Sequence, residues 1–271
     1  MVIYFPFQPE LKRNTLHYTE IKPITTHQSN IALYYQFHTK NESTTNLSLI
    51  PDGCFDFLFC CHSSKMNIFL WTSPLTRKEH PELLNDCTYF GVRFYPEQTA
   101  IQLNYPLSEL IGQLIILFEV LAIPYSILEE ITACNSFQQR IRAFETFIST
   151  FQQKITIQND MTKFIIQKIY ASKGMISVKA LSDDIGYTEQ YIRRKFTEKL
   201  GFSPKQFSKI VQFQHVIDEF FLTPDLSTQD IVYENGFYDQ AHFIKTFKQM
   251  THFTPKQYQQ YISNHVLLKT N

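Results

Sequence analysis

Two short stretches near the carboxyl end of the chain concentrate hydrogen-bonding cations and amides. In the first, Arg193 and Arg194 follow Gln190, and in the second Lys245 follows Gln240. A guanidinium group is a planar fork of donors that matches phosphates, carboxylates and base edges, and a carboxamide both donates and accepts. The chemistry available here is therefore recognition through hydrogen bonds.

The two stretches belong to an internal repeat. Leu181, Gly186 and Tyr187 return 50 residues later as Ile231, Gly236 and Phe237. Seven further residues return 51 positions later, namely Ile192, Phe196, Phe202, Pro204, Lys205, Gln206 and Phe207 as Phe243, Phe247, Phe253, Pro255, Lys256, Gln257 and Tyr258. The one-residue slip follows the glycine, where a turn can absorb it. The repeat indicates one supersecondary unit used twice.

Each unit is predicted to be a helix, a glycine turn and a second helix. We expect Gly186 to adopt left-handed backbone at the end of the first helix and Thr188 to cap the second. Within the second helix Ile192 and Phe196 form a narrow apolar stripe, which leaves the arginines facing outward. This layout is typical of a helix-turn-helix with an exposed recognition helix.

Residues 160–271 resemble the DNA-binding domain of AraC-type transcription regulators, on the strength of the two glycine turns and the two matched Phe-x-Pro-Lys-Gln-aromatic tails. The resemblance implies two helix-turn-helix units joined by a long helix, each placing its second helix in the major groove. Three positions depart from the pattern. His252 stands where the first copy has Gly201, Gln212 replaces a usual arginine in the joining helix, and Val216 replaces a usual alanine.

The resemblance also implies contact residues and partners. It assigns DNA contacts to Thr188, Gln190, Arg193, Arg194, Lys199, Lys205, Gln240, His242, Lys245, Lys248 and Lys256. Base edges would be met by Gln190, Arg193 and Arg194 in the first unit and by Gln240, His242 and Lys245 in the second. Double-stranded DNA and RNA polymerase are the partners expected for such a regulator.

The charge of the chain is unevenly distributed although its net value is zero. Residues 160–271 carry 14 Lys and Arg against 11 Asp and Glu, which leaves 11 against 14 in residues 1–159. A weakly basic region can bind phosphate only where its cations cluster. They cluster at 193–205 and 245–256. The alternative is a solvated helix face, but the coincidence with both recognition positions favours DNA.

The first 106 residues carry the signals of strands. Pro51, Asp52 and Gly53 form a turn sequence, and the aromatic residues of 55–59 then alternate in a strand that is apolar on both faces. A second strand is expected over 89–95. Several strands without crossover helices favour an antiparallel barrel or sandwich. The segments 50–59 and 91–96 resemble the barrel-like sensory domains found in part of the same family.

The pattern changes after Pro106. Apolar residues recur at helical spacing over 107–118, 127–131 and 137–151. Such helices could pack on the barrel or on the same helices of a second copy, so a homodimer through this half is expected, with internal packing as the alternative. The polar stretch 152–160 is the expected linker.

Catalytic and metal-binding patterns are not recognisable. The histidines are scattered, and the five cysteines have no Cys-x-x-Cys spacing, so we expect reduced thiols, no metal and no cofactor. Cys54, Cys60, Cys61 and Cys87 could form a zinc or alkyl-acceptor site or a redox sensor, although core packing is favoured. Asp56, Trp71 and Arg93 are the candidates for a ligand pocket. Their alternatives are an Asp56–Arg93 ion pair and a core tryptophan.

These observations predict an α+β chain of two domains. Residues 1–155 are expected to form an antiparallel β-barrel or sandwich with strands to about 106 and helices after it, and residues 160–271 an all-α double helix-turn-helix with units at about 178–200 and 228–251. The apolar run 110–118 is too short to span a membrane.

The expected function is that of a cytoplasmic, nucleoid-associated regulator, not an enzyme, that binds DNA and responds to a small molecule or another signal. The alternatives are a DNA-repair or DNA-modifying enzyme and a regulator that responds to a protein partner.

Overall fold

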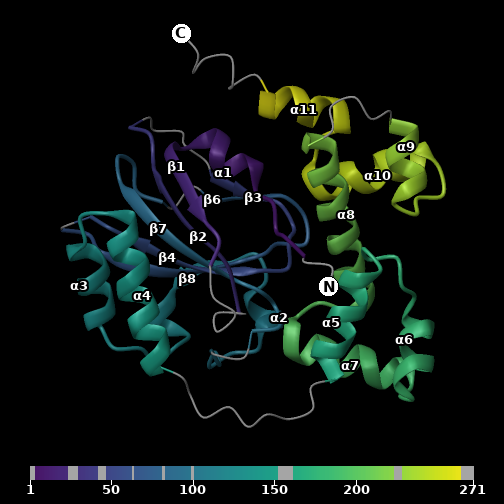
Figure 1. The fold of residues 1–271 in the computed structure, drawn as a ribbon, viewed down its shortest axis with the longest axis horizontal. Helices are drawn as coiled ribbons and strands as arrows, with labels where there is room; N and C mark the ends of the chain where they lie inside the picture. Colours follow the sequence, from purple (N-terminus) through teal and green to yellow (C-terminus); the bar gives the residue numbers. More distant parts are fainter. Residues whose placement is uncertain are drawn as a thin grey trace.

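The computed structural model describes residues 4–23, 30–41, 47–62, 64–80, 83–98, 101–151, 161–222 and 228–263. It shows an antiparallel sheet domain followed by a helical domain, so the predicted α+β class is confirmed (Figure 1). The predicted linker at 152–160 lies outside the described residues.

The N-terminal domain is built on one large sheet. Its strands are β1 (Leu16–Ile21), β2 (Ile31–His38), β4 (Phe55–Cys60), β5 (Asn67–Thr72), β7 (Thr88–Phe94) and β8 (Leu114–Ile116), in the order β1-β2-β7-β4-β5-β8. A separate two-stranded sheet pairs β3 (Leu47–Leu49) with β6 (Lys78–His80). The six-stranded sheet keeps β1 and β8 as edges, so it is open rather than a closed barrel.

The central strand β4 has the predicted period of two. Phe55, Phe57 and Phe59 face one apolar core, and Leu58 and Cys60 face another on the opposite side of the sheet. Both faces of the strand are therefore covered, which explains why no polar alternation appears in its sequence.

Helices α3 (Ser126–Ala133) and α4 (Phe137–Phe151) cover one face of the sheet, away from the C-terminal helices (Figure 1). Phe144 of α4 is fully buried and packs edge-on against Tyr34 and Phe59, with ring centroids 6.4 and 6.0 Å apart. The buried apolar residues of both helices thus complete the core of their own domain. They are not available as the dimer surface that the sequence suggested.

The prediction of a helix over residues 107–118 is wrong. Helix α2 stops after one turn (Leu107–Leu110), because Gly112 adopts a positive φ of 65°. The chain then adds β8 to the sheet beside β5, followed by a 3-10 turn, η2 (Leu117–Glu119). The apolar spacing of this segment reflects burial against the sheet edge.

A short helix that the sequence did not predict, α1 (Pro9–Asn14), lies before β1.

The C-terminal domain is entirely helical within its described residues. Its helices are α5 (Met161–Ala171), α6 (Val178–Ile185), α7 (Glu189–Leu200), α8 (Pro204–Leu222), α9 (Thr228–Glu234), α10 (Gln240–Thr251) and α11 (Pro255–Ser263). The predicted turn chemistry is confirmed, since Gly186 has φ 77° and the Thr188 side chain accepts a hydrogen bond from the Tyr191 amide. His252 adopts left-handed backbone, φ 68°, at the position where the first unit has a glycine.

The repeated Pro-Lys-Gln sequences lie at the starts of α8 and α11, where they take part in helix capping. Ser203 precedes α8, and its side chain accepts from the Gln206 amide while the Gln206 side chain accepts from the Ser203 amide at 2.8 Å. Thr254 and Gln257 make the same reciprocal pair before α11. Each tail is therefore a capping box that starts the helix closing its unit.

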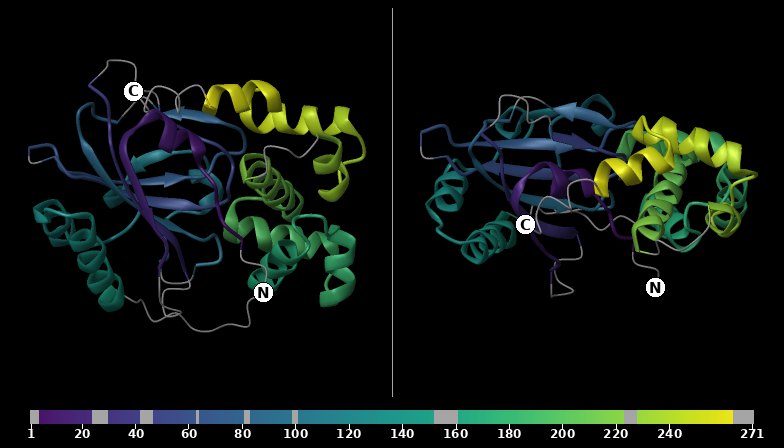
Figure 2. Two further views of the ribbon diagram at one scale, coloured as in Figure 1. Left: turned by 45° about the horizontal axis from the view of Figure 1, so that its top comes forward. Right: turned by 90° about the horizontal axis from the view of Figure 1, so that it is seen from above.

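The two domains lie side by side (Figure 2). Side chains from both domains pack together in two apolar clusters. Tyr4 stacks on Tyr170 of α5 with ring centroids 4.6 Å apart. Gly53 lies against the Phe207 ring so closely that a Cβ atom there would come within 2.6 Å of it. The first helix-turn-helix unit is thus packed directly on the N-terminal domain.

Candidate nucleic-acid interface

Helix α7 presents its polar residues to solvent. Ile192 and Phe196 are fully buried, as the stripe predicted. The predicted contact residues on this unit are exposed, namely Thr188, Gln190, Arg193, Arg194 and Lys199. The burial pattern therefore leaves one continuous polar face on α7.

The two arginines of α7 are held on the helix surface by weak interactions. Arg193 pairs with Glu189 at 2.9 Å and Arg194 lies 3.9 Å from Glu198. The Arg194 guanidinium also lies 5.5 Å from the centroid of the Tyr191 ring. Water and salt screen exposed pairs of this kind, so they contribute little to stability. They can be exchanged for contacts with an anionic partner at little cost.

An alternative to DNA contact is that Arg194 folds back onto the acidic end of α6 and pairs with Asp183 or Asp184. Asp184 instead pairs with Lys168 of α5 at 2.7 Å. Arg194 therefore remains on the outer face of α7.

Helix α10 repeats this arrangement with weaker hydrogen-bonding groups. Asp239 caps it by accepting from the His242 amide at 2.7 Å, and Phe243 and Phe247 are buried. Its predicted contact residues Gln240, His242, Lys245 and Lys248 are all exposed. Lys205 and Lys256 are exposed in the first turns of α8 and α11, at equivalent places in the two units. Cations thus accompany both recognition helices.

The predicted ligand residues Asp56 and Arg93 are a buried ion pair. Arg93 donates to both carboxylate oxygens of Asp56 at 2.7 Å, and its remaining nitrogen lies 3.2 Å from Asp52. The Tyr35 hydroxyl donates to Asp56 at 2.7 Å. Burial raises the pKa of Asp56, and the neighbouring Arg93 charge opposes that shift. These groups form a buried hydrogen-bonded network contributed by β2, β4, β7 and the turn before β4.

Trp71 is fully buried in the core between β4, β7 and the small sheet, with its ring edge-on to His80 at 5.3 Å. It does not line the interdomain cavity. Among the three predicted ligand residues, only Arg93 reaches the cavity described next.

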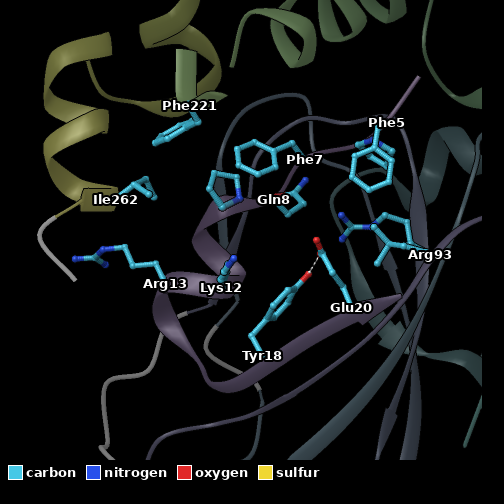
Figure 3. Close-up of a pocket in the computed structure, with 13 residues that line it drawn as sticks. Phe5, Phe7, Gln8, Lys12, Arg13, Tyr18, Glu20, Arg93, Phe221 and Ile262 are labelled. Atoms are coloured by element: carbon cyan, nitrogen blue, oxygen red, sulfur yellow. Dashed lines mark hydrogen bonds between the residues drawn. The ribbon is translucent and has the colours of Figure 1, made fainter. Parts of the chain in front are cut away.

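A cavity of about 500 Å³ lies between the domains, and we name it the interdomain pocket (Figure 3). It is lined by Phe5, Pro6, Phe7, Gln8, Pro9, Lys12, Arg13, Tyr18, Glu20, Leu33, Arg93, Phe221 and Ile262. Most of its wall is apolar, and Tyr18 donates to Glu20 at 2.7 Å at its edge. Sequence reasoning missed it because residues of 5–33 and 221–262 meet only in the folded chain.

The cysteines do not assemble a metal site. In the described part of the chain, no three or more His, Cys, Asp or Glu residues gather where they could hold an ion. Cys60 and Cys87 are both buried, with sulfur atoms 3.1 Å apart, and Cys54 packs against the C-terminal domain. Their surroundings are those of core thiols.

None of the described helices combines the length and apolarity needed to cross a membrane.

Comparison with known proteins places the repeat in a family. The family described as "Helix-turn-helix domain" matches residues 181–261, which contain both units, both glycine turns and both capping boxes. The C-terminal domain is an AraC-type helix-turn-helix domain. The sheet region 19–115 matches a family described as a domain of unknown function, DUF6597.

Curated relatives match through part of the chain only. Uncharacterized HTH-type transcriptional regulators of Staphylococcus aureus are 39% identical over 83 residues. This match covers 31% of the chain but only 11% of those much longer proteins. The chain therefore spans only about a tenth of the length of these relatives.

Solved structures of ToxT from Vibrio cholerae overlap with most of the chain at low similarity. One has 12% identity and a TM-score of 0.46 over 89% of this chain and 97% of that one. Another, described as unsaturated fatty acid bound, has a TM-score of 0.37. At these scores the overlap is not evidence about function.

Proposed function

We propose that this protein is a transcription regulator that binds specific DNA sequences through α7 and α10 and acts on bacterial chromosomal DNA in the cytoplasm. The observation that carries this proposal is the pair of capped helices, each with an apolar stripe buried and cations at equivalent exposed positions. RNA polymerase, implied by the family resemblance, is the proposed protein partner. No residue of the described chain is assigned to catalysis.

The proposal includes a mode of reading DNA. The stiff helix α8 joins the two units, so one protomer can place both recognition helices in successive major grooves, about 34 Å or 10 base pairs apart. Base edges would be contacted by Gln190, Arg193 and Arg194 in one groove and by Gln240, His242 and Lys245 in the next. A single chain should therefore recognise a long, non-palindromic site. Selection of random DNA by the purified protein tests this directly.

Binding should depend steeply on salt. If Lys199, Lys205, Lys248 and Lys256 meet phosphates, four contacts predict a slope near −3.6 for log K against log salt, at about −0.9 per phosphate. We expect Lys199→Ala to weaken all DNA sequences alike and to reduce the slope by about 1. Fluorescence anisotropy from about 50 to 300 mM salt measures both quantities.

Lys65 is a suitable control, because it is exposed in the β4–β5 turn of the N-terminal domain. Lys65→Ala should leave affinity and slope unchanged. A salt-insensitive affinity in the unmodified chain would contradict the proposed function.

We further propose that the regulator responds to a small, largely apolar molecule held in the interdomain pocket. A cavity of about 500 Å³ falls within the range of small-molecule sites, and its apolar walls and few polar groups are typical of them. Crystals soaked with candidate effectors test this. A protein-partner signal is the alternative, and it would leave the pocket empty at full response.

A homodimer remains part of the proposal, although the helices that suggested it are internal. The large apolar side chains that stay exposed between β7 and α3 are Tyr105, Ile116 and Tyr125, at 50%, 36% and 51%. Sedimentation equilibrium of the full chain is the measurement. A monomer at high micromolar concentration would remove the dimer from the proposal.

A further inference from the structure

Among the described residues, the walls of the interdomain pocket come from the N-terminal domain and from two residues of the C-terminal domain. These two are Phe221, near the end of α8, and Ile262, near the end of α11 (Figure 3). No residue of α5, α6 or α7 is among the lining residues that the structure describes. Within the described residues, the pocket therefore borders the ends of α8 and α11, which pack against the core of the second helix-turn-helix unit.

Phe221 and Ile262 belong to the core that supports the second recognition helix. The Phe221 ring packs edge-on against Tyr258, with centroids 6.2 Å apart. Tyr258 in turn packs against Phe247 of α10 at 5.7 Å. Three contiguous aromatic rings thus connect the pocket wall to α10.

A polar connection runs beside this aromatic one. The buried Glu10 carboxylate of α1 accepts from the Tyr258 hydroxyl at 3.0 Å and from Arg77 at 3.0 Å. Helix α1 also contributes Pro9, Lys12 and Arg13 to the pocket wall. An occupant that shifts α1 would therefore also act on the residue that anchors α11.

The first unit is attached differently. Gly53 meets the Phe207 ring directly, and the Tyr170 hydroxyl of α5 donates to Glu97 at 3.0 Å. The cavity beside this contact, which Leu200 and Phe202 also line, has a volume of only about 20 Å³, far below that of a small-molecule site. The second recognition helix is also bonded to the N-terminal domain, since the Arg77 amide donates to the Met250 carbonyl of α10 at 2.8 Å, but Arg77 is in turn bonded to Glu10 of the pocket-lining helix α1. The pocket therefore adjoins the contacts that hold α10 and not those that hold α7.

We propose that a small, largely apolar molecule in the interdomain pocket changes DNA affinity through the second helix-turn-helix unit alone, by altering the position of α10 relative to α7. This inference rests on the proposed function. Occupancy of the pocket should leave recognition of the first half of the DNA site unchanged. It should change the contribution of the second half to DNA affinity. Coupling between two sites in one protein typically changes affinity about 5- to 150-fold.

Anilinonaphthalene sulfonate, an apolar dye that fluoresces when removed from water, serves as the probe. Two variants report where it binds. Leu33 is 3% exposed and lines the pocket, so Leu33→Trp should fill part of the cavity and abolish dye binding. Ile21 on the neighbouring strand is 36% exposed and does not line the pocket, so Ile21→Trp should bind the dye as the unmodified protein does. Thermal unfolding confirms that both variants fold.

Affinity is then measured with and without dye for three DNA duplexes: the selected site, the site with its first half scrambled, and the site with its second half scrambled. We expect the dye to change affinity by at least about 5-fold for the first two duplexes and to have no effect on the third. Leu33→Trp should show no dye effect on any duplex.

Two results would overturn the inference: an equal dye effect on both scrambled duplexes, or dye that is bound in the pocket without any effect on affinity. Failure of the proposed function looks different, because the chain would then select no DNA sequence even without dye.

Discussion

Replacing Arg93 by methionine should destabilise the N-terminal domain by about 3–5 kcal/mol, the usual result of removing one partner from a buried ion pair. Arg93 is 2% exposed and lies between Asp52 and Asp56, which are equally buried. Methionine fills similar space but leaves two carboxylates without their cation. Urea unfolding followed by circular dichroism measures the loss.

The pH dependence of this loss has a definite sign. Burial already raises the pKa of Asp56, and removal of Arg93 removes the neighbouring charge that lowers it. A carboxyl whose pKa is higher in the folded than in the unfolded chain favours folding at low pH, and that contribution disappears as pH rises. The loss of unfolding free energy in Arg93→Met should therefore become smaller as the pH is lowered from about 8 to 5.

Asp56→Asn combined with Arg93→Met should recover part of the stability at neutral pH, because the amide carries no charge. An Arg93→Met variant whose urea midpoint equals that of the unmodified protein would show that the ion pair is not needed for folding.

The second large effect concerns sequence recognition. We expect Arg194→Ala to reduce affinity for the selected site by about 1–3 kcal/mol and to relax base preference at one or two positions. The guanidinium fork favours guanine, and in the free protein Arg194 is held only by a distant Glu198 and the Tyr191 ring. Repeating the random DNA selection with the variant measures both changes.

Lys199→Ala is the matched control, since it removes a cation from the same helix without removing a base contact. Its selected motif should equal that of the unmodified protein. If Arg194→Ala also returns the unmodified motif at uniformly lower affinity, Arg194 contacts phosphate and not a base.

The parts of the fold that the sequence predicted are those set by local chemistry. Gly186 as a left-handed C-cap, Thr188 as an N-cap and the stripe of Ile192 and Phe196 follow from neighbouring residues alone. The alternation along β4 could be predicted for the same reason. Interactions within a few residues leave a periodic trace in the sequence.

The parts that were missed depend on distant contacts. The segment 107–118 has helical spacing, but its place beside β5 makes it a strand and two short turns. The interdomain pocket brings Leu33 and Phe221 into one lining, and no local pattern marks either residue. Arg93 was a candidate ligand residue as a polar residue of the strand region, and it lines the pocket, but two of its nitrogens donate to Asp56.

The close approach of Gly53 to Phe207 also limits how these two domains can be exchanged with others. A glycine with a φ of 71° on one side and an aromatic ring on the other form a joint that tolerates no added atom. A chimera that joins this sheet domain to an unrelated DNA-binding domain would need an aromatic residue at the start of its joining helix to fill the same space. Transplanting the pair Gly53 and Phe207 together is therefore the rational starting point for engineering hybrid regulators from this scaffold.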